Sequence, residues 1–307
     1  MLLKKLNKLL FILLSISLLV GCSSGDSSDK DNEGKPPRDT TPQVKIPEAS
    51  GANTLGNSKV TIDISNNGQG YVMIQYNGSN PKVKIQITNP DASVYTYDKH
   101  DGYETFPLTG GNGNYQIGVY ENVSGNSYNK IYNDSFSVTL ENDFITYLYP
   151  SQYVNFTPET KAISKGQELA EDCYDELDVV TNVFNYMVDN VEYDYDKAAS
   201  VQTGYLPVVD DTLDSEKGIC FDYAALMATM LRTQGIPTRL EIGYAGEIYH
   251  AWISVYTAES GWVDDLIQFD GQNWQLMDPT FTAGKLNDDE TRQYVTDKNN
   301  YQVKYLY

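Results

Sequence analysis

The chain has 307 residues, with 42 acidic and 22 basic side chains, so its formal net charge is −20 at pH 7. This acidity argues against a nucleic-acid partner and against electrostatic binding to anionic lipid. Three cysteines are also too few for the disulfide framework that small exported domains often carry.

The first 22 residues have the pattern of an export signal. Lys4, Lys5 and Lys8 form a basic start, and an apolar run of 12 residues follows over 9–20. Such a run is too short to span a bilayer as a helix but typical of a secretory signal. It ends in Leu-Val-Gly-Cys22, which resembles the lipobox of bacterial lipoproteins. This resemblance implies that Cys22 becomes the acylated first residue, although an ordinary signal with a chance cysteine is the alternative.

If Cys22 is lipidated, the protein is held at the cell membrane on its extracytoplasmic face by a lipid anchor. Residues 23–57 are rich in Ser, Asp, Gly and Pro and have almost no large apolar side chains. A segment of this composition cannot bury enough surface to order itself, so we expect a disordered tether.

Residues 58–154 have the pattern of strands. Apolar and polar residues alternate over 60–64, 83–87 and 115–120, and Asn-Gly or Gly-Asn turn signals separate these runs. Several short strands at this spacing predict an all-β, immunoglobulin-like sandwich of about seven strands. His100 stands in a polar turn within this region, where we expect a solvated loop residue.

In residues 155–307 the spacing of apolar side chains first becomes that of helices and then returns to that of strands. An apolar stripe that includes Cys173 predicts one helix over about 159–190, with this thiol buried and inert. A second, buried helix is predicted from Cys220 to a stop at Gly235. Strand-like runs follow at 238–244 and 248–256 around an Ala-Gly-Glu hairpin signal, and two shorter runs come later. Helices followed by an antiparallel sheet predict an α+β domain.

Three residues in this second domain have complementary chemistry. Cys220 lies where the buried helix begins, and a helix start favours a thiolate through its free N–H groups and partial positive charge. His250 lies on a predicted strand, where its ring could serve as the base for the thiol. Asp278 ends a short apolar run and could orient that ring. The other interpretation is structural, with a core cysteine, a strand histidine and a turn aspartate.

Four fragments together resemble the transglutaminase-like superfamily: Gly-Ile-Cys220-Phe-Asp-Tyr-Ala, Gly-Ile-Pro-Thr-Arg, His250-Ala-Trp and Met-Asp278-Pro-Thr-Phe. The resemblance covers roughly residues 160–282 and implies a papain-like α+β core with Cys220, His250 and Asp278 as its catalytic residues. It also implies acyl transfer through a cysteine thioester, with either hydrolysis or transamidation of peptide or protein carboxamides. The alternative is a non-catalytic surface module that binds or scaffolds.

We expect no cofactor and no metal. The acidic pair at 210–211 and the acidic triplet at 288–290 lack the ligand spacing of a calcium site and are interpreted as solvated loops. The sequence therefore predicts four parts: a signal over 1–22, a tether over 23–57, a β-sandwich over 58–154 and a transglutaminase-like domain over 155–307.

Overall fold

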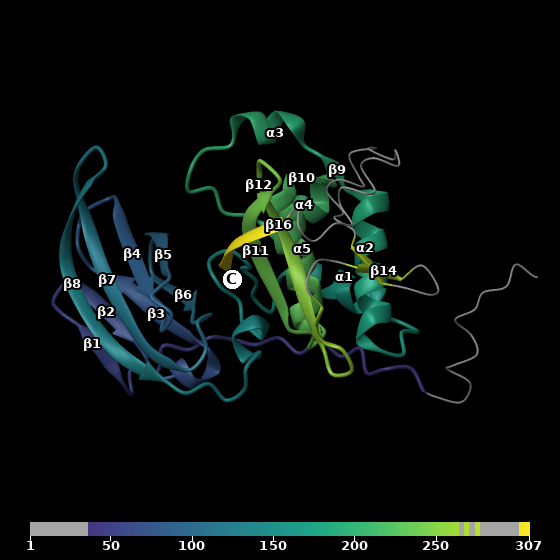
Figure 1. Ribbon diagram of the computed structural model, residues 1–307, viewed down its shortest axis with the longest axis horizontal. Coiled ribbons are helices and arrows are strands. Elements are labelled where there is room, and N and C mark those ends of the chain that lie inside the picture. The colour runs from purple at the N-terminus through teal and green to yellow at the C-terminus, as the bar shows by residue number, and fades with distance from the viewer. Residues whose placement is uncertain (1–35, 264–266, 270–273, 277–300) are drawn as a thin grey trace, which may run out of the picture. The chain divides into compact units, whose positions relative to one another are not determined.

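The computed structural model describes residues 36–263, 267–269, 274–276 and 301–307. Two antiparallel four-stranded sheets occupy the first half of this range, and helices around a third four-stranded sheet occupy the second (Figure 1).

Eight strands lie between residues 54 and 138. One sheet has the order β1-β2-β3-β6, and the other has the order β5-β4-β7-β8. Alternation explains their burial, since the β4 residues Val83, Ile85 and Ile87 point into a core to which both sheets contribute. The bounds are β1 Thr54–Gly56, β2 Val60–Asp63, β3 Tyr71–Tyr76, β4 Val83–Thr88, β5 Val94–Lys99, β6 Tyr103–Pro107, β7 Gly113–Ser124 and β8 Ser127–Val138.

The segment before these strands differs from the predicted tether. Residues 36–53 are placed in the structure without regular secondary structure, and β1 also falls inside the range predicted to be disordered. The Arg38 N–H donates to the Cys173 carbonyl at 2.8 Å, and the Gln43 N–H donates to the Thr233 carbonyl at 2.7 Å. The composition argument fails here because a few contacts with distant residues hold the segment: these backbone hydrogen bonds, and the packing of Val44 and Leu55 against the core.

The predicted long helix is two helices, α1 Lys161–Leu169 and α2 Glu176–Asn190. Asp172 has a φ of 61°, and Asp175 caps α2 by accepting the Asp178 N–H at 2.9 Å. The chain therefore reverses between the two apolar segments. Cys173 lies in this connection rather than on a helix, although it is buried as predicted.

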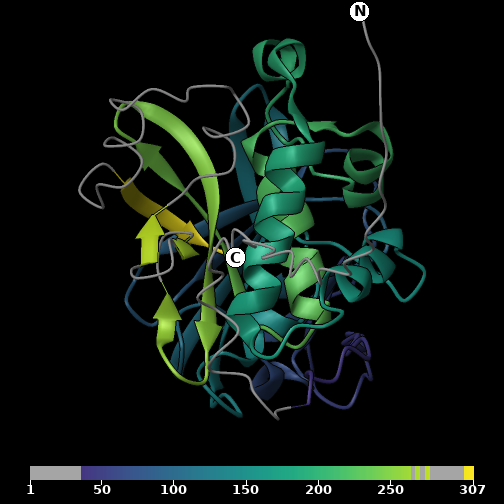
Figure 2. The same ribbon diagram turned by 90° about the vertical axis from the view of Figure 1, so that its right-hand side faces the viewer.

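The central helix, α5 Cys220–Thr233, starts and stops as predicted, and Gly235 adopts the left-handed conformation that ends it. Nearly all of α5 is buried because helices cover one side of it and strands the other. In Figure 2 the helices gather on one side of the sheet. The remaining helices are α3 Tyr195–Ser200 and α4 Val209–Ser215.

The sheet beside α5 has the order β13-β12-β11-β16. The hairpin of β11 Thr238–Ala245 and β12 Ile248–Thr257 confirms the predicted pair of strands. A strand that was not predicted, β16 Tyr301–Leu306, pairs antiparallel with β11. The short strands are β9 Glu192–Tyr193, β10 Lys217–Gly218, β13 Gly261–Val263, β14 Ile267–Phe269 and β15 Trp274–Leu276.

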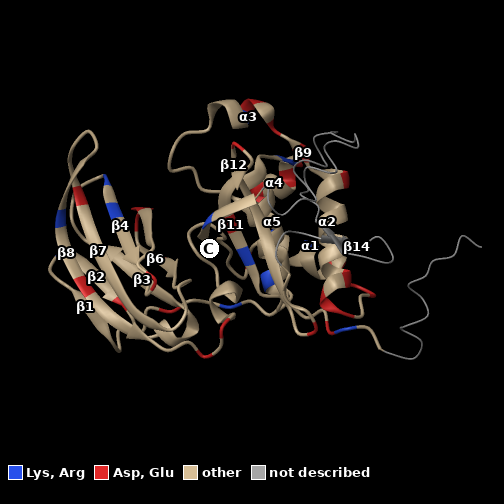
Figure 3. Cartoon of the chain, in the orientation of Figure 1, with Lys and Arg blue, Asp and Glu red and all other residues tan. Residues whose placement is uncertain are grey.

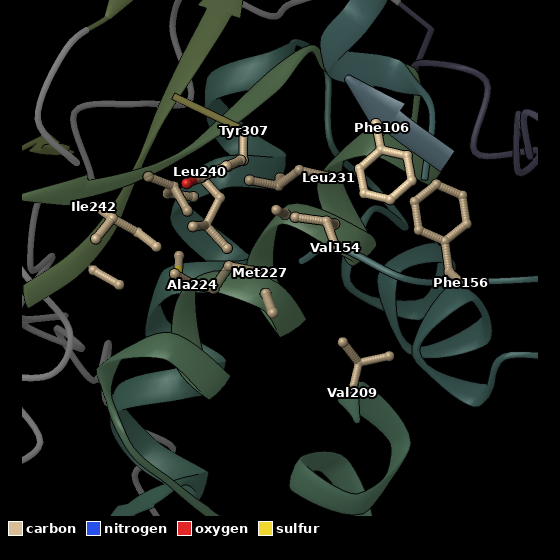
Figure 4. Close-up of a cluster of buried hydrophobic side chains, with 14 of the residues drawn as sticks. Phe106, Val154, Phe156, Val209, Ala224, Met227, Leu231, Leu240, Ile242 and Tyr307 are labelled. Atoms are coloured by element: carbon tan, nitrogen blue, oxygen red, sulfur yellow. The ribbon is translucent and has the colours of Figure 1, made fainter. Parts of the chain in front are cut away.

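One hydrophobic core runs through both halves. Figure 4 shows Leu231 of α5 and Leu240 of β11 near Tyr307. Val154 and Phe106, from the first half of the chain, belong to the same cluster. The Tyr307 ring also packs edge-on against Tyr95 and Tyr97 of β5. The mixed α/β character of the second half is therefore observed. The immunoglobulin-like assignment of the first half and the boundary at 154/155 remain predictions.

Candidate active site

Cys220 is the first residue of α5. Ile219 before it is extended, and its N–H donates to the Asp222 carboxylate at 2.8 Å. This contact holds the helix start, because isoleucine has no side-chain acceptor to cap the helix itself. A Cβ at Gly218 would lie 2.7 Å from the Asp222 Cβ, so only glycine allows this close approach.

His250 lies on β12, opposite Gly243 of β11 in the strand register. Only 4% of the residue is exposed, and its ring stacks on Trp252 with centroids 6.0 Å apart and planes 22° apart. α5 packs against β12, and His250 on this strand lines the same cavity as Cys220.

A cavity of about 590 Å³ joins the two side chains, since both Cys220 and His250 line it. Part of the wall around them is aromatic, and Tyr205 and Phe221 meet edge-on there with centroids 6.3 Å apart. The further aromatic residues of the wall are Tyr153, Tyr193 and Tyr249. The structure thus places two of the three predicted site residues on one concave surface.

The opposite wall of the cavity comes from the first half of the chain. It contains Lys84, Thr96, Asp98, His100 and Gln152. Lys84 and Asp98 form an ion pair at 2.6 Å. The β-sheet region is therefore part of the candidate site and not only a neighbouring module.

His100 is an exposed loop residue as expected, but it also faces this cavity. Its Nδ1 lies 3.0 Å from Glu104, which also accepts hydrogen bonds from Lys99 at 2.8 Å and Gln152 at 2.9 Å. Burial opposes ionisation of Glu104, but the hydrogen bonds from Lys99 and Gln152 outweigh it and lower the pKa of this carboxyl. Nothing in the local sequence indicated that this loop lines the same cavity as Cys220.

The second thiol has a different environment. Cys173 donates to the Leu169 carbonyl at 3.5 Å and accepts from Asn182 at 3.2 Å. Burial raises the pKa of Cys173 to about 11, so it remains a protonated thiol at neutral pH. Both Cys173 and Cys220 are free, with no disulfide between them.

Asp278 lies outside the described residues, as does the acidic triplet at 288–290. Asp210 of the other acidic pair accepts the N–H groups of Lys161 and Ala162 at 3.0 and 3.2 Å and so caps α1 from α4. Across the described ranges, no group of three or more His, Cys, Asp or Glu side chains could hold a metal ion.

The site thus consists of a cysteine at the start of a buried helix and a histidine on the adjoining strand, within a mixed α/β domain. Residues 163–279 match the family model of the transglutaminase-like superfamily. We assign this part of the chain to that superfamily, in agreement with the resemblance of its four sequence fragments.

Two curated proteins match shorter segments. The chain is 39% identical over 70 residues to a protein-glutamine gamma-glutamyltransferase from Pseudomonas aeruginosa, over 18% of this chain and 10% of that protein. It is 27% identical over 93 residues to UPF0252 protein MJ1282 from Methanocaldococcus jannaschii, over 26% of each chain. The matches thus span about a quarter of one curated relative and a tenth of the other.

Among solved structures, the periplasmic domain of TgpA from Pseudomonas aeruginosa aligns with 78% of this chain and 98% of its own length. The sequence identity is 15% and the TM-score is 0.34.

Proposed function

We propose that this protein is a surface-anchored cysteine acyl-transfer enzyme that acts on peptide or protein carboxamides through a thioester on Cys220. The observation that carries the proposal is the shared cavity, which brings Cys220 at the start of α5 together with His250 on β12. The aromatic walls of this cavity suit an extended peptide.

In the first half of the reaction, His250 takes the Cys220 proton and the sulfur attacks the carboxamide carbon. The backbone N–H of Cys220 is positioned to stabilise the oxyanion. His250 then donates the proton to the leaving amine as the carbon–nitrogen bond breaks and the thioester remains. Asp278 orients the His250 ring.

In the second half, water or an amine attacks the thioester, with His250 again taking the proton and returning it to the sulfur. Water gives hydrolysis and an amine gives a crosslink. We favour hydrolysis of peptides outside the cell, with transamidation as the second outcome of the same intermediate. A non-catalytic binding or scaffold role is the alternative.

Acyl trapping tests this proposal. Brief exposure of the folded protein to p-nitrophenyl acetate should add one acetyl group to Cys220, which mass spectrometry of the intact protein and its peptides would locate. Cys220→Ala should lose the adduct, and Cys173→Ala is the matched control that should keep it. Equal acetylation of wild type and Cys220→Ala, or none in either, would favour the scaffold role.

We further propose that Cys22 carries the lipid anchor. The described residues contain no helix that is long and apolar enough to cross a membrane. In those residues Lys and Arg occur singly among more numerous acidic side chains (Figure 3). We expect the lipid on Cys22, and not attraction of basic side chains to anionic lipid, to attach the protein to the membrane.

Metabolic labelling with a fatty-acid analogue should mark the full-length protein, and Cys22→Ala should abolish the label. Cys173→Ala serves as the control because it removes a thiol without touching the predicted lipobox. Retention of the label by Cys22→Ala would rule out this anchor.

A further inference from the structure

A buried carboxylate next to the candidate nucleophile has no role in the mechanism above. Asp222 is 0% exposed and lies two residues after Cys220 in α5. It accepts the Ile219 N–H at 2.8 Å, the Lys197 ammonium at 2.6 Å and the Tyr205 hydroxyl at 2.5 Å. The Lys197 ammonium also donates to the Tyr205 hydroxyl at 2.7 Å. We call Lys197, Tyr205 and Asp222 the Asp222 cluster.

The cluster connects the start of α5 to one wall of the cavity. Residues 193–206 form much of this wall, and their stretch 198–204 is exposed. Lys197 on α3 and Tyr205 after it both reach Asp222. In addition, the Asp194 N–H donates a hydrogen bond to the Gly218 carbonyl at 2.9 Å. Asp222 therefore holds both ends of the exposed stretch.

The charge of the cluster matters as much as its contacts. A carboxylate in the first turn of a helix stabilises the helix, but it opposes a thiolate in the same turn because the two charges are alike. The Lys197 ammonium offsets that charge. Burial opposes its ionisation, but the hydrogen bonds to Asp222 and Tyr205 raise the pKa of Lys197 above its ordinary value. Burial, followed by the bond to Asp222, raises the pKa of Tyr205 to about 12, so the phenol stays neutral.

We propose that the Asp222 cluster is a positioning unit for Cys220, in which Lys197 cancels the charge that Asp222 places near the sulfur and Asp222 fixes the cavity wall over it. The proposal rests on the proposed role of Cys220 as the nucleophile.

Other titratable groups also surround Cys220, and several of them are already paired with a group of opposite charge. His250 and Tyr249 face it from β12, and Lys217 beside the helix start pairs with Glu192 at 3.7 Å. Across the cavity lie Lys84, Asp98 and His100, of which Lys84 and Asp98 neutralise each other. The remaining groups are phenols, Tyr153 and Tyr193. Asp222 and Lys197 form a pair that single substitutions can unbalance without touching the thiol–imidazole pair, and Asp222 is in the first turn of α5 with Cys220.

The experiment measures the rate of Cys220 alkylation by iodoacetamide against pH in the folded protein. Lys197→Met should move the midpoint of the profile to higher pH by about half a unit or more, because it leaves the Asp222 carboxylate uncompensated. Asp222→Asn should move it to lower pH, because it leaves the Lys197 cation uncompensated. The double variant should return close to the wild-type midpoint.

Lys165→Met is the matched control. Lys165 also lies between a carboxylate and a tyrosine, with Glu168 at 2.6 Å and the Tyr186 ring at 5.2 Å, but these residues do not line the cavity. This control should leave the alkylation profile unchanged.

Opposite shifts that cancel in the double variant would support the proposal, since a purely structural defect would not reverse its sign. Shifts in the same direction, or no shift in Lys197→Met, would overturn it. If Asp222→Asn does not fold, the Lys197→Met shift alone decides. Tyr205→Phe supplies a second readout. It should speed backbone hydrogen exchange over 198–204 and leave the midpoint of the alkylation profile unchanged. These results are separable from acyl trapping, which can fail while the alkylation midpoint still responds to the cluster.

Discussion

Replacing His250 by alanine is expected to slow alkylation of Cys220 by roughly tenfold or more near pH 6 to 7. In the wild type, the buried imidazole on β12 can take the thiol proton and remain beside the sulfur as a cation. Without it, the sulfur loses the group that takes its proton, while the α5 start and the Asp222 cluster remain. The measurement is the alkylation rate against pH in folded protein, and the two profiles should differ most at this low end of the pH range.

The chain supplies a matched control for this experiment. It contains only two histidines, and both line the same cavity from opposite walls. His100→Ala removes an imidazole that is paired with Glu104 and should leave the Cys220 profile close to that of wild type. If His100→Ala changes the profile and His250→Ala does not, the wrong histidine has been assigned as the partner of the thiol. Asp278→Ala should slow alkylation less than His250→Ala, since it leaves the ring in place.

Local patterns predicted the elements that carry the candidate pair. The start of α5 at Cys220, its stop at Gly235 and the β11–β12 hairpin with His250 all follow from capping, periodicity and turn chemistry over a few residues. The assignment to the transglutaminase-like superfamily followed from the same segments.

Features that depend on contacts between distant residues could not be predicted in this way. The residues of β16 alternate between apolar and polar, a local strand pattern, but this pattern does not indicate that the strand pairs with the distant β11. The far wall with His100 and Gln152 reaches the cavity through packing of the two halves. Asp222 stood in the quoted Cys220 motif, but its partners Lys197 and Tyr205 precede it by 25 and 17 residues, which no helical or strand period connects.

Arg232 shows the same limit and leads to the largest expected loss of stability. Its position in the last turn of α5 is typical of a cation that faces the helix end and solvent. Instead it is 1% exposed. It donates to the backbone oxygens of Thr238 at 2.9 Å, Tyr149 at 2.7 Å and Tyr307 at 2.8 Å. One guanidinium thus joins the sheet, the segment before α1 and the residue that follows β16.

Burial lowers the pKa of Arg232 to about 9, so the guanidinium is still charged at neutral pH. Among the described residues no Asp or Glu side chain forms an ion pair with it. Its charge is therefore stabilised by three main-chain oxygens, and these oxygens in turn depend on the guanidinium as their donor.

Arg232→Met should lower the free energy of unfolding by about 3 kcal/mol or more, because three buried backbone oxygens lose a charged donor at once. Arg232→Lys should recover only part of this loss, since an ammonium cannot reach three divergent acceptors. Urea unfolding monitored by circular dichroism would measure both changes. Lys161→Met removes a cation whose side chain is 61% exposed and should change the free energy by less than about 1 kcal/mol. If Arg232→Met is no more costly than this surface control, packing of apolar side chains and not the guanidinium fork holds β16 and the 149–154 segment on α5.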